Sequence, residues 1–324
     1  MKGKLGAAAP VLRPVLDTYM DSAVAVIGCS SRGMARYSCE YDVLVVGSEA
    51  RPSRSLRIGD DFVELRFATE KEVLKPTTPE IALSIALAKP IKDTSLVLST
   101  ASATSAATAS DSATRASRAR LASALKTLGR AEVALSRKDL VDADLWLLAS
   151  SYEFAYAMLL SHEVLPSPSH LLTQLRSVPK SASGGFEGVS IGSGLEAAGR
   201  AGCGARLEGL TVLHDLLRES SKPEVVESAW PGVRTEILAA KANELITRVE
   251  LAECYSFLGQ ELVDDLMELM RKHPRATLAA LTSGKDQLLG ERLVRQLGLA
   301  RGEKGIRAGM DVLMAQVNLL AKKG

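Results

Sequence analysis

Two carboxylates one residue apart, Glu40 and Asp42, are the part of this sequence best suited to chemistry. They stand at the start of an apolar, β-branched run over residues 41–46, which is typical of a buried strand. In an extended strand, residues i and i+2 point the same way, so the two carboxylates share one face. Adjacent carboxylates repel each other unless a cation lies between them. Because Mg²⁺ binds a few carboxylates together with phosphate oxygens, the spacing predicts a divalent-metal site.

A turn of small and polar residues precedes these carboxylates. The β-branched run over residues 23–27 predicts another buried strand, and the turn follows it directly. Backbone N–H groups and hydroxyls at the start of a short helix suit a phosphate. The candidates for binding such a phosphate are Gly28, Cys29, Ser30, Arg32 and Gly33.

The stretch from Gly28 to Val46 resembles the first motif of the DNA polymerase β-like nucleotidyltransferase superfamily. Small members of that superfamily carry Gly-Ser, then Arg-Gly, then Ser-Asp-x-Asp followed by an apolar strand. The matching positions here are Gly28-Cys29, Arg32-Gly33 and Cys39-Glu40-Tyr41-Asp42. Taken over the whole domain that this motif implies, the resemblance covers about a quarter of the chain.

The resemblance implies a third carboxylate on a later strand of the same sheet. Glu64 is the matching candidate, and Asp60 and Asp61 are weaker ones because they precede the predicted strand. Glu40, Asp42 and Glu64 would then be both the metal ligands and the catalytic residues, holding two Mg²⁺ ions. The implied reaction moves a nucleoside monophosphate from a nucleoside triphosphate to a hydroxyl on a small molecule, a protein or an RNA end.

Two departures from the family pattern keep a second function open. Cys29 replaces the usual Ser, and a thiol is a poorer hydrogen-bond partner for phosphate. Glu40 replaces the usual first Asp, and its extra methylene shifts the carboxylate in a site that demands near-ideal geometry. The retained Asp42 favours an enzyme, whereas Glu40 favours a catalytically silent nucleotide- or partner-binding module, such as the antitoxin-like half of a two-component system.

The helices and strands expected around the three carboxylates indicate an α+β domain over residues 1–95. Apolar residues at helical spacing predict helices at 11–20 and 79–87, flanking a mixed sheet. The sheet's strands are expected at 23–27, 41–46 and 62–67. We expect no strand after Thr69.

Beyond residue 95 the pattern is helical, and we expect a helical domain over 96–180 and a helical C-terminal domain over 195–324. Residues 99–117, dense in Ala, Ser and Thr, fit either a low-complexity linker or a helix, and the absence of Gly and Pro favours the helix. Residues 181–194 are rich in Gly and Ser and predict an exposed loop. Further helices are expected at 121–135, 140–160, 169–178, 207–217, 233–258, 262–270, 276–281, 288–297 and 306–320.

The net charge, the aromatic content and the cysteine spacing each argue against particular classes of protein. A net charge of +2 and 4% aromatic residues give little support to an RNA-processing enzyme with a basic groove or a base-stacking surface. The four cysteines form no CxxC pair, which favours reduced thiols in a cytoplasmic protein over a zinc site or disulfides. Because no uncharged apolar run reaches about 18 residues, we expect no membrane-spanning segment.

Overall fold

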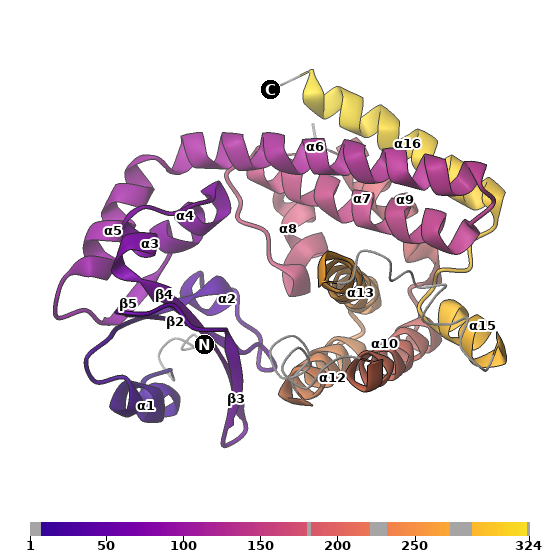
Figure 1. Ribbon diagram of the computed structural model, residues 1–324. Helices are drawn as coiled ribbons and strands as arrows, with labels where there is room; N and C mark the ends of the chain where they lie inside the picture. Colours follow the sequence, from indigo (N-terminus) through magenta and orange to yellow (C-terminus); the bar gives the residue numbers. More distant parts are fainter. Residues whose placement is uncertain (1–7, 180–182, 221–231, 273–286, 323–324) are drawn as a thin grey trace. The chain divides into compact units, whose positions relative to one another are not determined.

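The structure, a computed structural model, describes residues 8–179, 183–220, 232–272 and 287–322 (Figure 1). The chain divides into two compact units. The first contains Met1–Ala116 and Glu224–Glu244, and the second contains Ser117–Pro223 and Leu245–Gly324. The first unit therefore includes a segment from late in the sequence. The domain boundaries expected at residue 95 and between 180 and 195 stay predictions.

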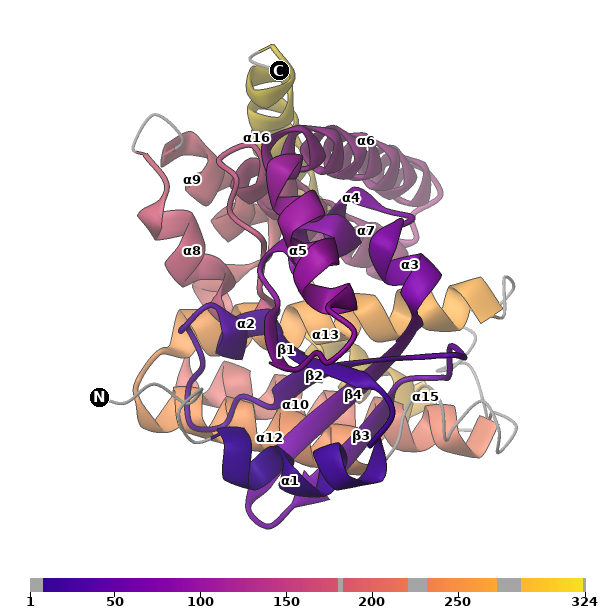
Figure 2. The same cartoon turned by 90° about the vertical axis from the view of Figure 1, so that its left-hand side faces the viewer.

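A five-stranded mixed sheet forms the centre of the first unit, with the strand order β3-β4-β2-β1-β5. Strands β1, β2, β3 and β4 are labelled in Figure 2. The pair β2–β4 is parallel, and the pairs β1–β2, β1–β5 and β3–β4 are antiparallel. The strands are β1 (Ala23–Ile27), β2 (Tyr41–Gly47), β3 (Arg54–Ile58), β4 (Asp61–Thr69) and β5 (Lys89–Lys92). The mixed sheet expected from the sequence is confirmed, together with all three of its expected strands.

Two strands at the edges of the sheet were not expected. The prediction of no strand after Thr69 is wrong, because β5 pairs with β1. Its sequence, Lys-Pro-Ile-Lys, carries the charges and the proline that natural edge strands use against unwanted pairing. The other edge strand, β3, is mostly exposed and carries two arginines. Neither edge strand has the continuous apolar pattern by which a central strand is recognised.

Helices cover both faces of this sheet. On one face, Leu12 and Val15 of α1 (Ala8–Thr18) pack on strand residues such as Val26 and Val43. On the other face, Ile27 and Leu44 belong to a core completed by α3 (Glu70–Leu74), α4 (Pro79–Ala86) and α5 (Val97–Ala107). Burial on both faces explains why β1 and β2 read as unbroken apolar runs.

In its described residues, the second unit is helical, as expected. Its elements include α6 (Ala109–Ser136), which begins in the first unit, and α12 (Gly232–Thr247), which ends in the second. The others are α7 (Leu140–Leu160), η2 (Pro168–His170), α8 (Leu171–Ser177), α9 (Ser183–Gly192), η4 (Leu195–Ala197), α10 (Arg200–Ser220), α13 (Leu251–Lys272), α15 (Gln287–Gln296) and α16 (Glu303–Ala321). Residues 99–117 lie almost wholly in α5 and α6, so the helix rather than the linker is confirmed. None of the helices searched within the described residues is long and apolar enough to cross a membrane.

The loop expected at residues 181–194 is wrong, because α9 occupies most of it. Its glycines are packing residues. A Cβ at Gly185 would overlap the sulfur of Met158 on α7, and a Cβ at Gly192 would overlap the hydroxyl of Ser151 on the same helix. These small residues let α7 and α9 approach closely. Glycines used in this way leave no local sequence pattern that distinguishes a helix from a loop.

The single helix expected at 233–258 is also wrong. It is divided into α12 and α13 by residues 248–250, where Val249 adopts a positive φ of 61°. A β-branched residue rarely takes that conformation, so no local pattern indicates a break at this position. The helix expected at 276–281 lies outside the described residues.

Candidate active site

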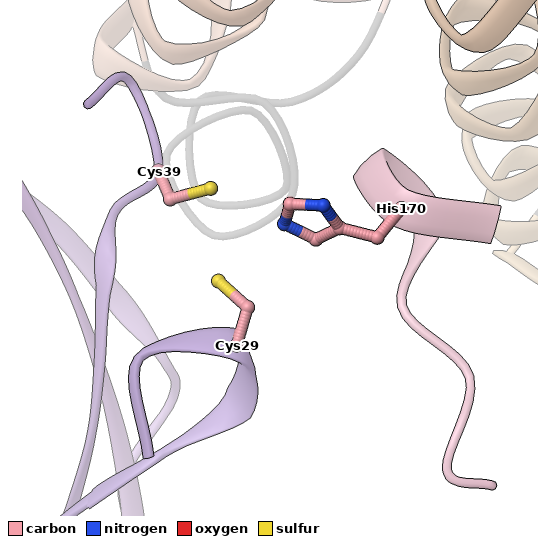
Figure 3. A group of neighbouring side chains, drawn as sticks. All are labelled: Cys29, Cys39 and His170. Carbon is pink, nitrogen blue, oxygen red and sulfur yellow. The ribbon is translucent and has the colours of Figure 1, made fainter. Parts of the chain in front are cut away.

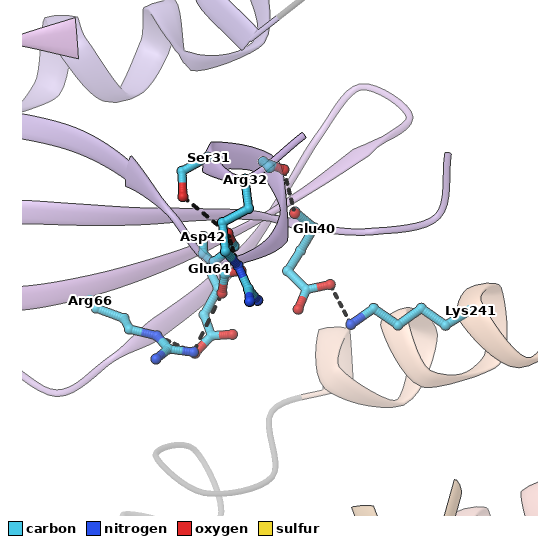
Figure 4. Close-up of polar contacts among 9 residues, drawn as sticks. Ser31, Arg32, Glu40, Asp42, Glu64, Arg66 and Lys241 are labelled. Atoms are coloured by element: carbon cyan, nitrogen blue, oxygen red, sulfur yellow. Dashed lines mark hydrogen bonds and ion pairs between the residues drawn. The ribbon is translucent and has the colours of Figure 1, made fainter. Parts of the chain in front are cut away.

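Three carboxylates meet where the start of β2 lies beside Glu64 of β4. Asp42 on β2 is the register partner of Glu64 on β4, and because these strands are parallel both side chains leave the same face of the sheet. Glu40 directly precedes β2. One oxygen from each of Glu40, Asp42 and Glu64 lies within 4.8 Å of the other two (Figure 4). The structure therefore brings together the residues expected to form a metal site.

The two weaker candidates lie outside this group. Asp61 begins β4, three residues before Glu64, and pairs with Ile58 of β3. Asp60 is 92% exposed and contacts Arg57 at 3.9 Å. Among the candidates considered, Glu64 is the third carboxylate of the cluster.

The backbone of Gly28, at the start of the short helix α2 (Gly28–Ser31), lies directly against the Asp42 side chain. Its φ is +67°, a conformation that favours glycine. A Cβ at this position would overlap the Asp42 carboxylate. Gly28 is therefore required both by the turn and by the space that Asp42 occupies.

The polar side chains of the turn hold its shape. The Ser31 hydroxyl donates to the Gly28 carbonyl oxygen at 3.0 Å, and the Arg32 Nε donates to the same oxygen at 3.2 Å. The Ser30 hydroxyl donates to the Glu40 carbonyl oxygen at 3.5 Å, which ties the turn to the carboxylate segment. Binding of a nucleotide by Gly28, Cys29, Ser30, Arg32 and Gly33 stays a prediction.

Cys29 and Cys39 flank the same turn, and their sulfur atoms lie within 4.8 Å of each other (Figure 3). The backbone N–H of Arg36 donates to the Cys39 sulfur at 3.3 Å. A hydrogen bond with Cys39, together with burial, raises the pKa of the Cys29 thiol well above its ordinary value. Burial and this hydrogen bond therefore favour the neutral thiol form of Cys29. All four cysteines are free thiols.

Two basic side chains contact the carboxylates, and neither was recognised from the sequence. The Lys241 Nζ lies 2.6 Å from the Glu40 Oε2. One guanidinium nitrogen of Arg66 lies 3.4 Å from the Asp42 Oδ1, and its Nε lies 3.3 Å from the Glu64 Oε1 (Figure 4). Arg66 could have been found, because it stands two residues after Glu64 on the same strand face. Lys241 had no local pattern that pointed to it.

Burial and mutual repulsion set the protonation of the cluster. Burial, and then the charge of Glu40, raise the pKa of Asp42 to about 8. Burial would also raise the pKa of Glu40, but the Lys241 ammonium holds it below its ordinary value. Burial would lower the pKa of Arg66, but the charges of Glu64 and Asp42 raise it above its ordinary value. A further cation between Asp42 and Glu64 would relieve the repulsion that remains, so these oxygens fit a site for a hard divalent cation.

No protein-family model matches the sequence, and no curated protein matches it. The chain is similar to a solved structure, the crystal structure of a nucleotidyltransferase-like protein from Exiguobacterium sibiricum 255-15. The match covers 93% of this chain and 92% of that one, with 15% sequence identity and a TM-score of 0.36.

Proposed function

We propose that this protein is a metal-dependent nucleotidyltransferase, which moves a nucleoside monophosphate from a nucleoside triphosphate to a hydroxyl acceptor. The observation that supports it is the convergence of Glu40, Asp42 and Glu64 within 4.8 Å beside the Gly28 turn. Carboxylates at this spacing suit a Mg²⁺ ion that also binds phosphate oxygens. The acceptor hydroxyl would belong to a small molecule, a protein or an RNA end.

The roles of the side chains follow from their positions. Asp42 is only 11% exposed and lies between Glu40 and Glu64, so it is the ligand whose charge matters most to a bound cation. When bound, Mg²⁺ would polarise phosphoryl oxygens and lower the pKa of the attacking hydroxyl. Arg66 is 51% exposed, and its guanidinium is free to turn from the carboxylates to a phosphate. The Gly28 turn leaves room for Asp42 where any other residue would collide with it.

A second candidate is a catalytically silent module that binds a nucleotide or a partner. It is favoured by the two ion pairs, because Lys241 and Arg66 already offset much of the carboxylate charge without a metal. Glu40 in place of the family's usual Asp points the same way. The two candidates differ in whether the cluster supports turnover.

Nucleotide transfer from radiolabelled triphosphates, with Mg²⁺ and a mixed pool of acceptors, tests the proposal. We expect turnover in the wild type and a loss of about 10²-fold or more in Asp42→Asn, because catalysis of this kind is mostly charge stabilisation and positioning. Asp60→Asn is the matched control, since Asp60 is exposed and outside the cluster. Undiminished turnover in Asp42→Asn would remove the cluster from the mechanism. No turnover and no nucleotide binding in the wild type would favour the silent module.

A further inference from the structure

Lys241 supplies a positive charge directly beside Glu40. Its ammonium lies 2.6 Å from the Glu40 carboxylate, and the two side chains are only 11% and 14% exposed. An ion pair so shielded from water is screened little by solvent and salt. The charge of Glu40 is therefore already balanced by the protein itself.

A second contact holds α12, the helix that carries Lys241, against the segment that leads into Glu40. Glu244 follows Lys241 by three residues, so both side chains lie on one face of α12. The Glu244 carboxylate accepts from the Ser38 backbone N–H at 2.8 Å, two residues before Glu40. Farther along α12, Glu236 pairs with Arg57 at 3.4 Å. Lys241 is thus held in place by contacts at several points along its helix.

Arg66 is held far less firmly. Its side chain is 51% exposed, and its contacts with Asp42 and Glu64 are 3.3–3.4 Å long. Asp42 and Glu40 are similarly shielded, so the two pairs differ in their basic side chains: the half-exposed guanidinium of Arg66 returns to water at little cost, whereas the ammonium of Lys241 is only 11% exposed. An incoming cation therefore displaces Arg66 from Asp42 and Glu64 more readily than it displaces Lys241 from Glu40.

We propose that Lys241 takes the place of one of the two divalent cations, so that the site binds a single ion. Asp42 and Glu64 coordinate that ion, while Glu40 stays paired with Lys241 and acts as a positioning residue. This inference rests on the proposed function and limits its metal requirement to one ion per chain.

Titration of the full-length protein with Mn²⁺, counting free ions by electron paramagnetic resonance, tests the inference without any measurement of activity. We expect one Mn²⁺ per wild-type chain. Lys241→Met should bind Mn²⁺ at least about tenfold more tightly, because Glu40 then becomes an available ligand. The charge-neutral double variant Glu40→Gln/Lys241→Met should bind one Mn²⁺ with an affinity within about threefold of the wild type, whereas Asp42→Asn should lose about tenfold or more.

The outcomes separate this inference from the proposed function. Two Mn²⁺ ions per wild-type chain, or a tenfold loss in the double variant, would show that Glu40 is a metal ligand and overturn the inference alone. No Mn²⁺ binding by the wild type would overturn the proposed function as well. Glu236→Gln, which removes the pair with Arg57 from the same helix, is the control for a loosened α12 and should bind like the wild type. Because the double variant removes both charges of the Glu40–Lys241 pair, it decides the question even if Lys241→Met fails to fold.

Discussion

Asp42 on β2 and Glu64 on β4 are register partners in the parallel strand pair of the sheet. Adjacent parallel strands present partner residues on the same face. The two carboxylates thus converge through backbone hydrogen bonding, although a turn and an edge strand separate them in the sequence. A shift of one residue in the β2–β4 register would send Glu64 to the opposite face.

We expect Glu64→Gln to lower nucleotide transfer by about 10²-fold, because the change removes one ligand charge and keeps the shape of the side chain. Asp61→Asn on the same strand should retain wild-type turnover, since Asp61 lies outside the cluster. Single-turnover assays with Mg²⁺ measure both rates. Equal losses in the two variants would mean that overall charge rather than the cluster is responsible.

Glu40→Asp should lower activity and not restore it. The Lys241 ammonium lies 2.6 Å from the Glu40 carboxylate, so the pocket is fitted to the longer side chain. Shortening it by one methylene lengthens a shielded ion pair and leaves both charges poorly compensated. A comparison of turnover and melting temperature between wild type and Glu40→Asp is the measurement. A gain in turnover would show instead that Glu40 is a degenerate ligand.

Gly28→Ala and Gly33→Ala form a matched pair, because both glycines have positive φ angles, +67° and +72°. Each change should cost about 1–2 kcal/mol of unfolding free energy through the left-handed backbone alone. Only Gly28→Ala should also weaken Mn²⁺ binding, since its Cβ would overlap the Asp42 carboxylate while nothing lies within 4 Å of a Cβ at Gly33. Chemical denaturation and Mn²⁺ titration separate the two effects. Equal Mn²⁺ affinities in the two variants would contradict this account of Gly28.

The helix α3 should show a stability that depends on pH through Glu72. The Thr69 backbone N–H and hydroxyl donate to the Glu72 carboxylate, and these bonds lower the pKa of Glu72. A carboxyl whose pKa is lower in the folded state stabilises the fold above its ordinary pKa of 4.5 and loses that contribution as the pH falls through the folded value.

Glu72→Gln should therefore melt at a lower temperature than the wild type at pH 7, and the difference should shrink as the pH falls below 4.5 and through the lower folded pKa of Glu72. The amide keeps the reach of the side chain, so the comparison isolates its charge. Melting curves across this range measure the effect. A difference that stays constant with pH would rule out the charge as its source.

In the second unit, Arg301→Met should be strongly destabilising. Arg301 donates to the Asp144 carboxylate, which is fully buried, and to the carbonyl oxygens of Ile191 and Gly192 at the end of α9. Loss of one partner of a buried pair costs about 3–5 kcal/mol. Arg307→Met, which breaks an exposed pair with Glu303, should cost about 0.5 kcal/mol or less. Denaturant unfolding of both variants measures the loss of unfolding free energy. Similar losses in the two variants would contradict the importance of the buried pair.

The sequence alone determined the local parts of this protein. Continuous apolar runs identified β1 and β2, because central strands buried on both faces leave that pattern in consecutive residues. Alternation of two unlike faces identified β4. The pairing of Glu40 with Asp42 was likewise visible, since their spacing and the extended backbone place them on one side. Glu64 could be selected because a strand was expected around it.

The tertiary structure decided the rest. Edge strands β3 and β5 depend on a neighbour for their hydrogen bonds and carry polar residues, so their sequences resemble loops. The glycines of α9 make sense only beside α7. Lys241 lies far along the chain from Glu40, and its ion pair exists only because α12 packs in the first unit. Periodic burial leaves a repeating pattern in a sequence, whereas a contact between two single side chains distant in the chain leaves none.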